Sequence, residues 1–293
     1  MILNIVAPVF IIIIVGFVLG KFYKKLDADS LVAVLVYITV PALIVTSISK
    51  SPVQLAEFFQ IIAIGSLIVL ISGGLLYVIL RIFKSNMHGL YLPLTIGNTG
   101  YLGYPIALAA FGGLGLSRAI VYDVTSSIFL FSIGIFIVHS RNELKEIFKI
   151  PLIYALAAGI LLNVLKISLP EIVFKPLEMI GSITIPLALI VLGHRLASIK
   201  ISHLKISLLA SLFKIVGGFL IALVVVLILK LDSDIAKVII LQAAMPSAVM
   251  SMILCHKYKR DSDVVTSIVM VSTILSVLTI PLVIYFLMNF RNS

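Results

Sequence analysis

The stretch LTIGNTGYLGYPIA, from Leu94 to Ala107, decides how this chain is expected to fold. It sets three glycines, a proline and an Asn-Thr pair inside an otherwise apolar segment. In hydrocarbon, main-chain N–H and C=O groups need partners within the protein, so helix-breaking residues are tolerated only where the freed backbone is covered or lines a cavity. A second stretch of this kind, QAAMPSAVMS, runs from Gln242 to Ser251. The two stretches predict a binding site formed by broken membrane helices.

The composition excludes a soluble protein. Of the 293 residues, 61% are hydrophobic and 12% are charged, and the mean hydropathy is +1.26, whereas soluble domains are nearer half apolar. We expect an all-α integral membrane protein with ten spans, most of them near the ~20 residues that cross a bilayer. The spans are expected at 3–20, 31–49, 57–80, 88–111, 119–138, 151–166, 171–193, 206–229, 235–255 and 264–288.

The first span is not expected to be a signal peptide, because no basic residues precede it and no small-residue cleavage site follows it. The single cysteine, Cys255, excludes an intrachain disulfide.

The distribution of Lys and Arg predicts the orientation in the membrane. Of the 22 Lys and Arg residues, fourteen lie in one set of alternate loops, seven lie in the other set, and Lys214 lies within a span. Cytoplasmic loops carry the excess of positive charge. We therefore expect a multi-pass protein of the cell membrane, with Lys24 and Arg141 in cytoplasmic loops and both termini extracellular.

Segments of the two halves echo each other in the same order. ITVPALIV at 38–45 is similar to ITIPLALIV at 183–191, with the prolines 145 positions apart. The same shift carries Gly100 onto Met245, so that one broken segment falls on the other. Such self-similarity indicates an internal repeat.

A third echo, DVTSSI from Asp123 and DVVTSI from Asp263, is offset by 140 positions. Each half would hold five spans. Since five is an odd number, the second half enters the membrane from the opposite face, as in alternating-access carriers. We expect two inverted five-helix repeats, residues 1–147 and 148–293.

These segments resemble the auxin efflux carrier family, which includes the plant PIN-type transporters and bacterial and archaeal members. The fourth span of that family carries Asn-Thr followed by Gly-x-Pro, matched here by Asn98, Thr99, Gly103 and Pro105. Its motifs in spans 2, 8 and 9 are matched by Val40, Pro41, Ile48 and Ser49, by Lys214, and by Ala244, Met245, Pro246 and Tyr258.

The resemblance covers the whole chain and implies a ten-helix fold like that of the bile acid sodium symporters. Spans 1, 2, 6 and 7 would form a scaffold. Spans 3–5 and 8–10 would form a transport domain in which the broken helices 4 and 9 cross. This chain differs from the plant members in having only HSRNELKEIFK, residues 139–149, between its halves, and Ser247 where they have Gln.

The two breaks are expected to bind an anion. Half-helix N-termini offer unpaired N–H groups and a partial positive charge, while freed carbonyls suit a cation. The alternative is that the glycines only allow close helix packing, and Tyr101 could stack on a planar substrate or face lipid or another helix. The candidate substrate-binding residues are Gly97, Asn98, Thr99, Gly100, Tyr101, Pro105, Gln242, Met245, Pro246 and Ser247.

Two charged residues are candidates for a role in binding or coupling. Lys214 lies eight residues from the cytoplasmic start of its span, about 12 Å along a helix. It therefore either attracts substrate or snorkels to the surface. Asp123 forms a polar stripe with Ser126 and Ser127, at i, i+3 and i+4. Asp123 either carries H⁺ or Na⁺ or pairs with a cation at the surface.

Three classes of function compete. An intramembrane enzyme needs paired acids, a metal site or an activated nucleophile at depth. We find no such pattern, so no catalytic residue, metal or cofactor is expected. A channel shows a repeated pore loop or rings of charge, whereas paired broken helices favour alternating access.

We therefore expect a secondary transporter that moves a small organic anion, a carboxylate, by elevator-type alternating access. The alternatives are an anion channel and a sodium-coupled symporter of a different organic solute. The expected partners are the organic anion, H⁺ or Na⁺ as coupling ion, the lipid bilayer and a second copy in a homodimer. Nucleic acid is not expected, because no long basic cluster occurs.

Overall fold

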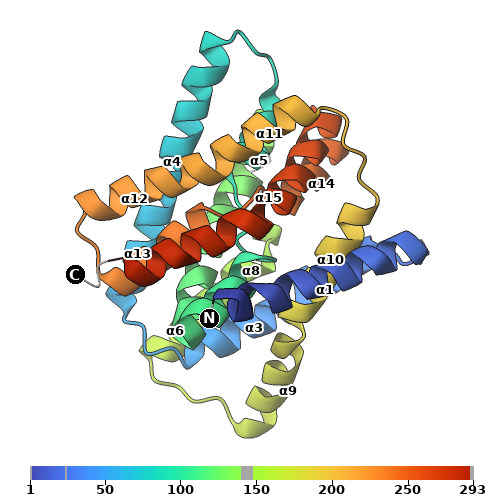
Figure 1. Ribbon diagram of the computed structural model, residues 1–293. Helices are drawn as coiled ribbons and strands as arrows, with labels where there is room; N and C mark the ends of the chain where they lie inside the picture. Colours follow the sequence, from blue (N-terminus) through green and yellow to red (C-terminus); the bar gives the residue numbers. More distant parts are fainter. Residues whose placement is uncertain (1, 24, 140–147, 291–293) are drawn as a thin grey trace.

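The computed structural model describes residues 2–23, 25–139 and 148–290, and these residues form helices joined by short loops, without strands (Figure 1). The prediction of an α-helical membrane protein is confirmed. The helices are α1 Ile2–Phe22, α2 Ala28–Val34, η1 Leu35–Thr39, α3 Val40–Ser49, α4 Leu55–Ile82, η2 His88–Leu90, α5 Tyr91–Thr95, α6 Gly103–Phe129, η3 Leu130–Gly134, α7 Ile135–His139, α8 Pro151–Val164, α9 Glu171–Ser182, α10 Thr184–Ala197, α11 Leu204–Leu212, η5 Phe213–Gly217, α12 Gly218–Ile228, α13 Ser233–Ala243, α14 Val249–Lys257 and α15 Ser262–Asn289.

Seven continuous helical stretches of the described chain are long and apolar enough to cross a membrane, rather than ten. They are Ile2–Phe22, Ala28–Ser49, Leu55–Ile82, Gly103–His139, Glu171–Ala197, Leu204–Ile228 and Ser262–Asn289. The apolar helix α8 is shorter and ends at Val164. The difference has a physical cause, because the expected spans 4 and 9 are each interrupted by a break.

The expected spans 4 and 5 are also joined at one point. The 37-residue stretch Gly103–His139 is continuous except at Gly112, where φ is 68° and ψ is −163°. A side chain with a Cβ rarely adopts this conformation, so glycine is required at the kink.

Two pairs of helices pack with their main chains close together. α1 lies along α10, and α3 lies along α8 (Figure 1). A Cβ added to Gly193 would overlap the main chain of Ile13, and one added to Gly16 would overlap that of Ile190. Small residues at a membrane-helix interface allow this close approach, which makes α1 and α10 a tightly fitted unit.

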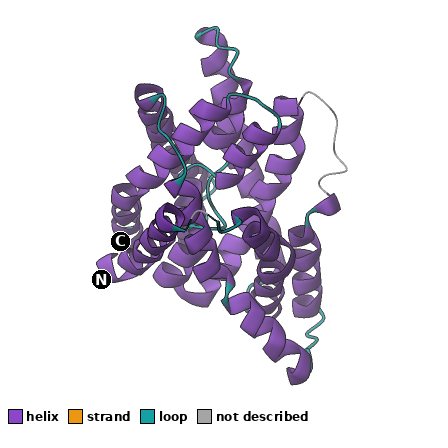
Figure 2. Ribbon diagram, turned by 90° about the vertical axis from the view of Figure 1, so that its right-hand side faces the viewer, coloured by secondary structure: helices purple, strands orange, loops and turns teal. Residues whose placement is uncertain are grey.

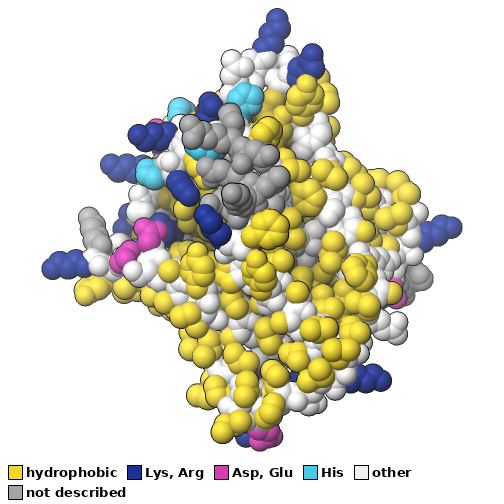
Figure 3. Space-filling view, turned by 180° about the vertical axis from the view of Figure 1, so that it is seen from behind, with side chains coloured by type: hydrophobic (Ala, Val, Ile, Leu, Met, Phe, Trp, Pro, Cys, Tyr) yellow, Lys and Arg dark blue, Asp and Glu magenta, His cyan; other side chains and the backbone are white. Residues whose placement is uncertain are grey.

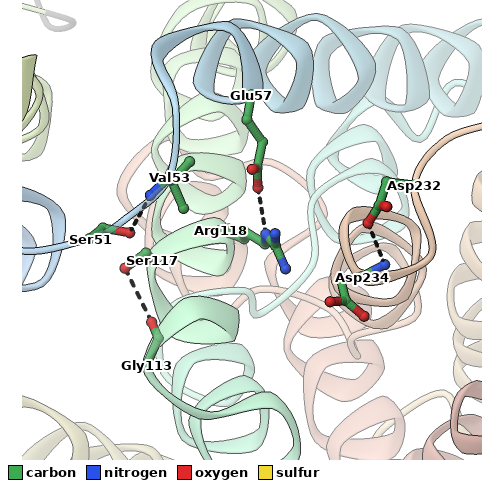
Figure 4. Close-up of polar contacts among 8 residues, drawn as sticks. All are labelled: Ser51, Val53, Glu57, Gly113, Ser117, Arg118, Asp232 and Asp234. Atoms are coloured by element: carbon green, nitrogen blue, oxygen red, sulfur yellow. Dashed lines mark hydrogen bonds and ion pairs between the residues drawn. The ribbon is translucent and has the colours of Figure 1, made fainter.

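The remaining long helices pack around the two breaks. α4 contacts α6, α11 contacts α15, and α12 contacts α13. A mostly buried ion pair, from Arg118 Nε to Glu57 Oε1 at 2.5 Å, joins the start of α4 to the part of α6 beyond the kink (Figure 4). The breaks themselves form loop segments in the interior of the bundle (Figure 2).

The surface matches a bilayer environment. Apolar side chains cover most of the face in Figure 3, with a group of Lys, Arg and His side chains at its upper left and further Lys and Arg side chains at its outer edges. Lys24, Arg141, Lys145 and Arg291, which enter the charge count of the sequence, lie outside the described residues.

Candidate functional site

The two broken segments meet and pair through their main chains. Gly97 and Ser247 form an isolated antiparallel bridge. Asn98 N donates to Pro246 O at 2.6 Å, and Ala248 N donates to Ile96 O at 3.1 Å. We call this paired region, residues 96–103 and 244–248, the crossing.

The hydrogen bonds of the crossing set its register. They pair Asn98 with Pro246 and Ile96 with Ala248. The sequence echo, which carries Gly100 onto Met245, relates equivalent positions of the two halves and does not say which residues face each other. The hydrogen bonds between the two segments fix that.

Glycines are needed in the crossing because other groups approach its main chain closely. A Cβ on Gly103 would collide with the side-chain amide of Gln242. A Cβ on Gly97 would lie 3.3 Å from Met245 Cβ and 3.4 Å from Lys214 Nζ. Gln242 is fully buried, and neither its Oε1 nor its Nε2 has a hydrogen-bond partner among the described residues.

Lys214 points into the crossing and not toward the membrane surface. Its side chain is 4% exposed, and Nζ donates to Ala243 O at 3.0 Å. Ala243 is the last residue of α13, and helix C-termini have free carbonyls and a partial negative charge. The snorkelling interpretation is therefore wrong, because the break in the second half provides an acceptor at the depth of the ammonium group.

Asp123 lies on the other side of the same loop. It is buried next to Gly100 and accepts hydrogen bonds from Thr99 Oγ1 and from Tyr104 Oη, the latter at 2.7 Å. The interpretation of Asp123 as a surface residue paired with a cation is wrong. The helix that carries it packs against the crossing, and the hydroxyls of the first break take up both carboxylate oxygens.

A cavity of ≈ 340 Å³ borders the crossing. One wall contains Gly97, Asn98, Thr99, Gly100, Tyr101, Tyr104, Asp123, Ser127, Ala248, Val249 and Met250. The opposite wall contains residues of α2, η1, the start of α3 and α10, among them Val36, Val40 and Ala188, and the charged residues Asp29 and Lys149 also line the cavity.

Three polar groups that line the cavity have no hydrogen-bond partner among the described residues. They are Asn98 Nδ2, Tyr101 Oη and Thr184 Oγ1, all of which are buried. Tyr101 packs against the buried cluster of Leu35, Ala188 and Val191, in η1 and α10. It therefore contacts another helix, as one of the alternatives held, and still lines the cavity.

The remaining predicted site residues lie behind the wall. Met245, Pro246 and Ser247 are part of the crossing, and Pro105 and Gln242 lie next to it, but none of the five lines the cavity. Lys214 likewise does not line the cavity, and its Nζ lies close to Gly97.

Ala248, Val249 and Met250, which were not among the predicted site residues, do line the cavity. The signal for them was available, because residues that follow a helix-breaking proline start the next half-helix, and α14 begins at Val249.

Comparisons with known proteins agree over the full length of the chain. The family described as "Membrane transport protein" matches residues 1–149 and 142–284. An uncharacterized transporter of Methanocaldococcus jannaschii is 30% identical, over 98% of this chain and 99% of the relative. An uncharacterized transporter of Methanothermobacter thermautotrophicus is 29% identical, over 94% of this chain and 95% of the relative.

Proposed function

This chain belongs to the membrane transport protein family, the family of the auxin efflux carriers, and from that premise we propose that it is a secondary transporter of small organic anions. The proposed mechanism is elevator-type alternating access, and the proposed substrates are carboxylates. The observation that carries the proposal is the cavity at the crossing, where a half-helix N-terminus and an unpaired amide donor lie on the same wall.

The proposed preference for anions rests on the hydrogen-bond donors of the cavity wall. The first residues of a helix have N–H groups that no carbonyl of that helix accepts, together with a partial positive charge. The first residues of α14, Val249 and Met250, line the cavity. Asn98 Nδ2 adds a side-chain donor. A carboxylate at this wall would accept from both sources, whereas a neutral amide would gain less from the charge.

The carboxyl group of Asp123 suggests how transport is coupled. Asp123 lines the same cavity, so an ionised Asp123 would repel a substrate carboxylate. We propose that Asp123 is protonated when the anion binds, which makes H⁺ the coupling ion. Buried acidic residues serve as proton carriers in other transporters. Coupling to Na⁺ would instead require that Asp123 stay ionised beside the metal.

The packing supports a ten-span inverted repeat. In that repeat α1 corresponds to α8 and α3 to α10, so the contact of α1 with α10 recurs as the contact of α8 with α3. The contact of α4 with α6 likewise recurs as that of α11 with α15. Gly112 would separate spans 4 and 5, and the two breaks would lie within spans 4 and 9.

The position of the cavity supports a moving transport domain. The cavity separates α2, η1 and α10 from the crossing. We propose that the former belong to a fixed scaffold and that the crossing moves past it with α4, α6 and α11–α15. Asp29, in the first turn of α2, and Lys149 line the cavity and lie in the segments that the sequence analysis assigned to the positively charged loops, so the described state would open to the cytoplasm, with both termini outside.

The proposal is tested by ligand-induced thermal stabilisation of the purified protein. A ligand that binds only the native state raises the apparent stability. We expect small carboxylates to raise the melting temperature more at pH 5.5 than at pH 7.5, and their neutral amide analogues to have no effect. Equal stabilisation by amides would contradict the anion assignment, and stabilisation that requires Na⁺ at both pH values would contradict H⁺ coupling.

A further inference from the structure

A second cavity lies between α4, the η2–α5 segment and the η3–α7 segment, and the one residue that it shares with the cavity at the crossing is Ile96. Its volume is ≈ 510 Å³, and none of the residues that line it carries a carboxylate. Leu70, Ile133 and Phe136 belong to its lining and are 54%, 47% and 55% exposed. The cavity is thus a groove that opens on the apolar outside of the helices, where lipid chains would surround it.

Glycines leave part of the groove without side chains. A Cβ on Gly74 would meet no atom within 4 Å, and the nearest atom to a Cβ on Gly73 would be Thr95 Cγ2 at 3.8 Å. Both glycines line the groove. The main chain of α4 is therefore open to an occupant, and the space is not a consequence of tight helix packing, which would place atoms of a neighbouring helix next to these glycines.

One end of the groove carries positive charge. Tyr77 and His88 line this end. Arg81 Nη1 donates to Tyr77 Oη at 2.8 Å, and the Arg81 guanidinium lies 6.0 Å from the centroid of the Tyr77 ring. The nearby carboxylate of Asp261 accepts a hydrogen bond from Gly89 N at 2.8 Å. Arg81 is thereby held beside the groove, with donors left for an anion.

We propose that this groove binds an acyl chain of an anionic phospholipid of the cytoplasmic leaflet, with the lipid phosphate at Arg81. The groove follows α4 from Val69 to Tyr77, about 12 Å of helix. Arg81 lies one turn beyond its end, so Val69 and Arg81 are about 18 Å apart along the helix, which is close to half of the ~30 Å hydrocarbon core. Basic pockets between membrane helices on the cytoplasmic side are typical sites for anionic lipid headgroups. Apart from Ile96, the residues that line this site are different from those that line the cavity proposed for transport.

Native mass spectrometry of the full-length protein tests this directly. The protein is incubated with phosphatidylglycerol or phosphatidylcholine of identical chains, and the lipid retained per polypeptide is counted. We expect the unmodified protein to retain one phosphatidylglycerol in preference to phosphatidylcholine. Gly74→Leu fills the groove and should lose this lipid, whereas Gly113→Leu should retain it, because a Cβ at Gly113 also meets no atom within 4 Å and lies outside the groove.

The contribution of the Arg81 charge to lipid binding is tested by a second substitution, which leaves the shape of the groove unchanged. Arg81→Gln should lower the preference for phosphatidylglycerol about fivefold, and Lys230→Gln, at an exposed position away from the groove, should leave it unchanged. Equal retention of the two lipids by the unmodified protein would overturn the proposal. Equal retention of phosphatidylglycerol by Gly74→Leu and Gly113→Leu, or a loss of dimer and not of lipid in Gly74→Leu, would also overturn it.

Discussion

Asn98 shows most directly how one residue could serve binding. Its main-chain N–H joins the two breaks through Pro246 O, while its side-chain Nδ2 is buried in the cavity wall without a partner among the described residues. A buried polar group without a partner costs free energy. The side chain therefore carries no evident benefit for folding, which is the pattern expected of a group that binds a ligand.

Asn98→Ala should weaken the binding of a carboxylate ligand by about ten- to a hundredfold. A hydrogen bond to a charged group contributes about 1.5 to 3 kcal/mol, and the main-chain pairing with Pro246 does not need the side chain. Isothermal titration of the purified protein measures the change, with Asn86→Ala in an exposed loop as control. Unchanged affinity in a well-folded Asn98→Ala protein would remove this residue from the site.

Lys214→Met should weaken anion binding without abolishing it. The ammonium group lies behind the cavity wall, so it acts on the ligand through its field and not by contact. The substitution also leaves Ala243 O without its donor, and we expect a loss of stability of about 1.5 to 3 kcal/mol. Ligand titration and thermal unfolding measure the two effects separately. Full loss of binding in a folded variant would show direct contact instead.

At the scale of elements, the two broken helices depend on each other for their shape. Neither broken segment can provide hydrogen-bond partners for all of its own main-chain groups. Each supplies an acceptor to the other, Pro246 O to Asn98 N and Ile96 O to Ala248 N. Since unsatisfied main-chain groups in a membrane each cost several kcal/mol, the crossing is a unit that forms or is lost as a whole. The close approach of Gln242 to Gly103 fixes how the two elements fit.

Gly103→Ala should destabilise the protein by about 1 to 3 kcal/mol, the usual cost of overpacking, because the new methyl group would collide with the Gln242 amide. Gly113→Ala is the matched control, with open space around its Cβ. The double variant Gly103→Ala with Gln242→Ala should recover part of the loss. Thermal unfolding compares the four proteins, and equal stability of Gly103→Ala and Gly113→Ala would rule out the collision.

At the scale of the whole molecule, the cavity lies between two groups of helices that are built differently. α1 and α10 fit closely through Gly16 and Gly193, whereas the cavity separates most of the crossing from α2 and α10, and Tyr101 is packed across it. Apposed surfaces that leave a cavity can slide more easily than interlocked main chains. This difference is what an elevator movement would use.

Single cysteines test the proposed orientation and the open side of the cavity. In a Cys255→Ser background, Ala33→Cys in the cavity wall should react with a membrane-impermeant thiol reagent from the cytoplasmic side, and bound ligand should slow the reaction. Gln54→Cys, at the start of α4, should react from the outside. Labelling of the two positions from the reverse sides would contradict the predicted topology.

The sequence alone was enough to predict an α-helical membrane protein, two interrupted segments and the resemblance to a transporter family. These features follow from local properties. Apolar length indicates a span, and glycine, proline and polar residues at depth indicate a break, whatever the rest of the chain does. For the same reason Gly97, Asn98, Thr99, Gly100 and Tyr101 could be named as site candidates from their positions in the chain.

Only the tertiary structure decided the register of the crossing, the direction of Lys214, the burial of Asp123 and the division between residues that line the cavity and residues behind it. Each of these depends on which distant segment lies opposite. A lysine in a span either reaches the surface or finds an internal acceptor, and the acceptor, Ala243 O, is 29 positions away in the chain. Local pattern places residues at a depth in the membrane, but packing between helices determines which of them meet.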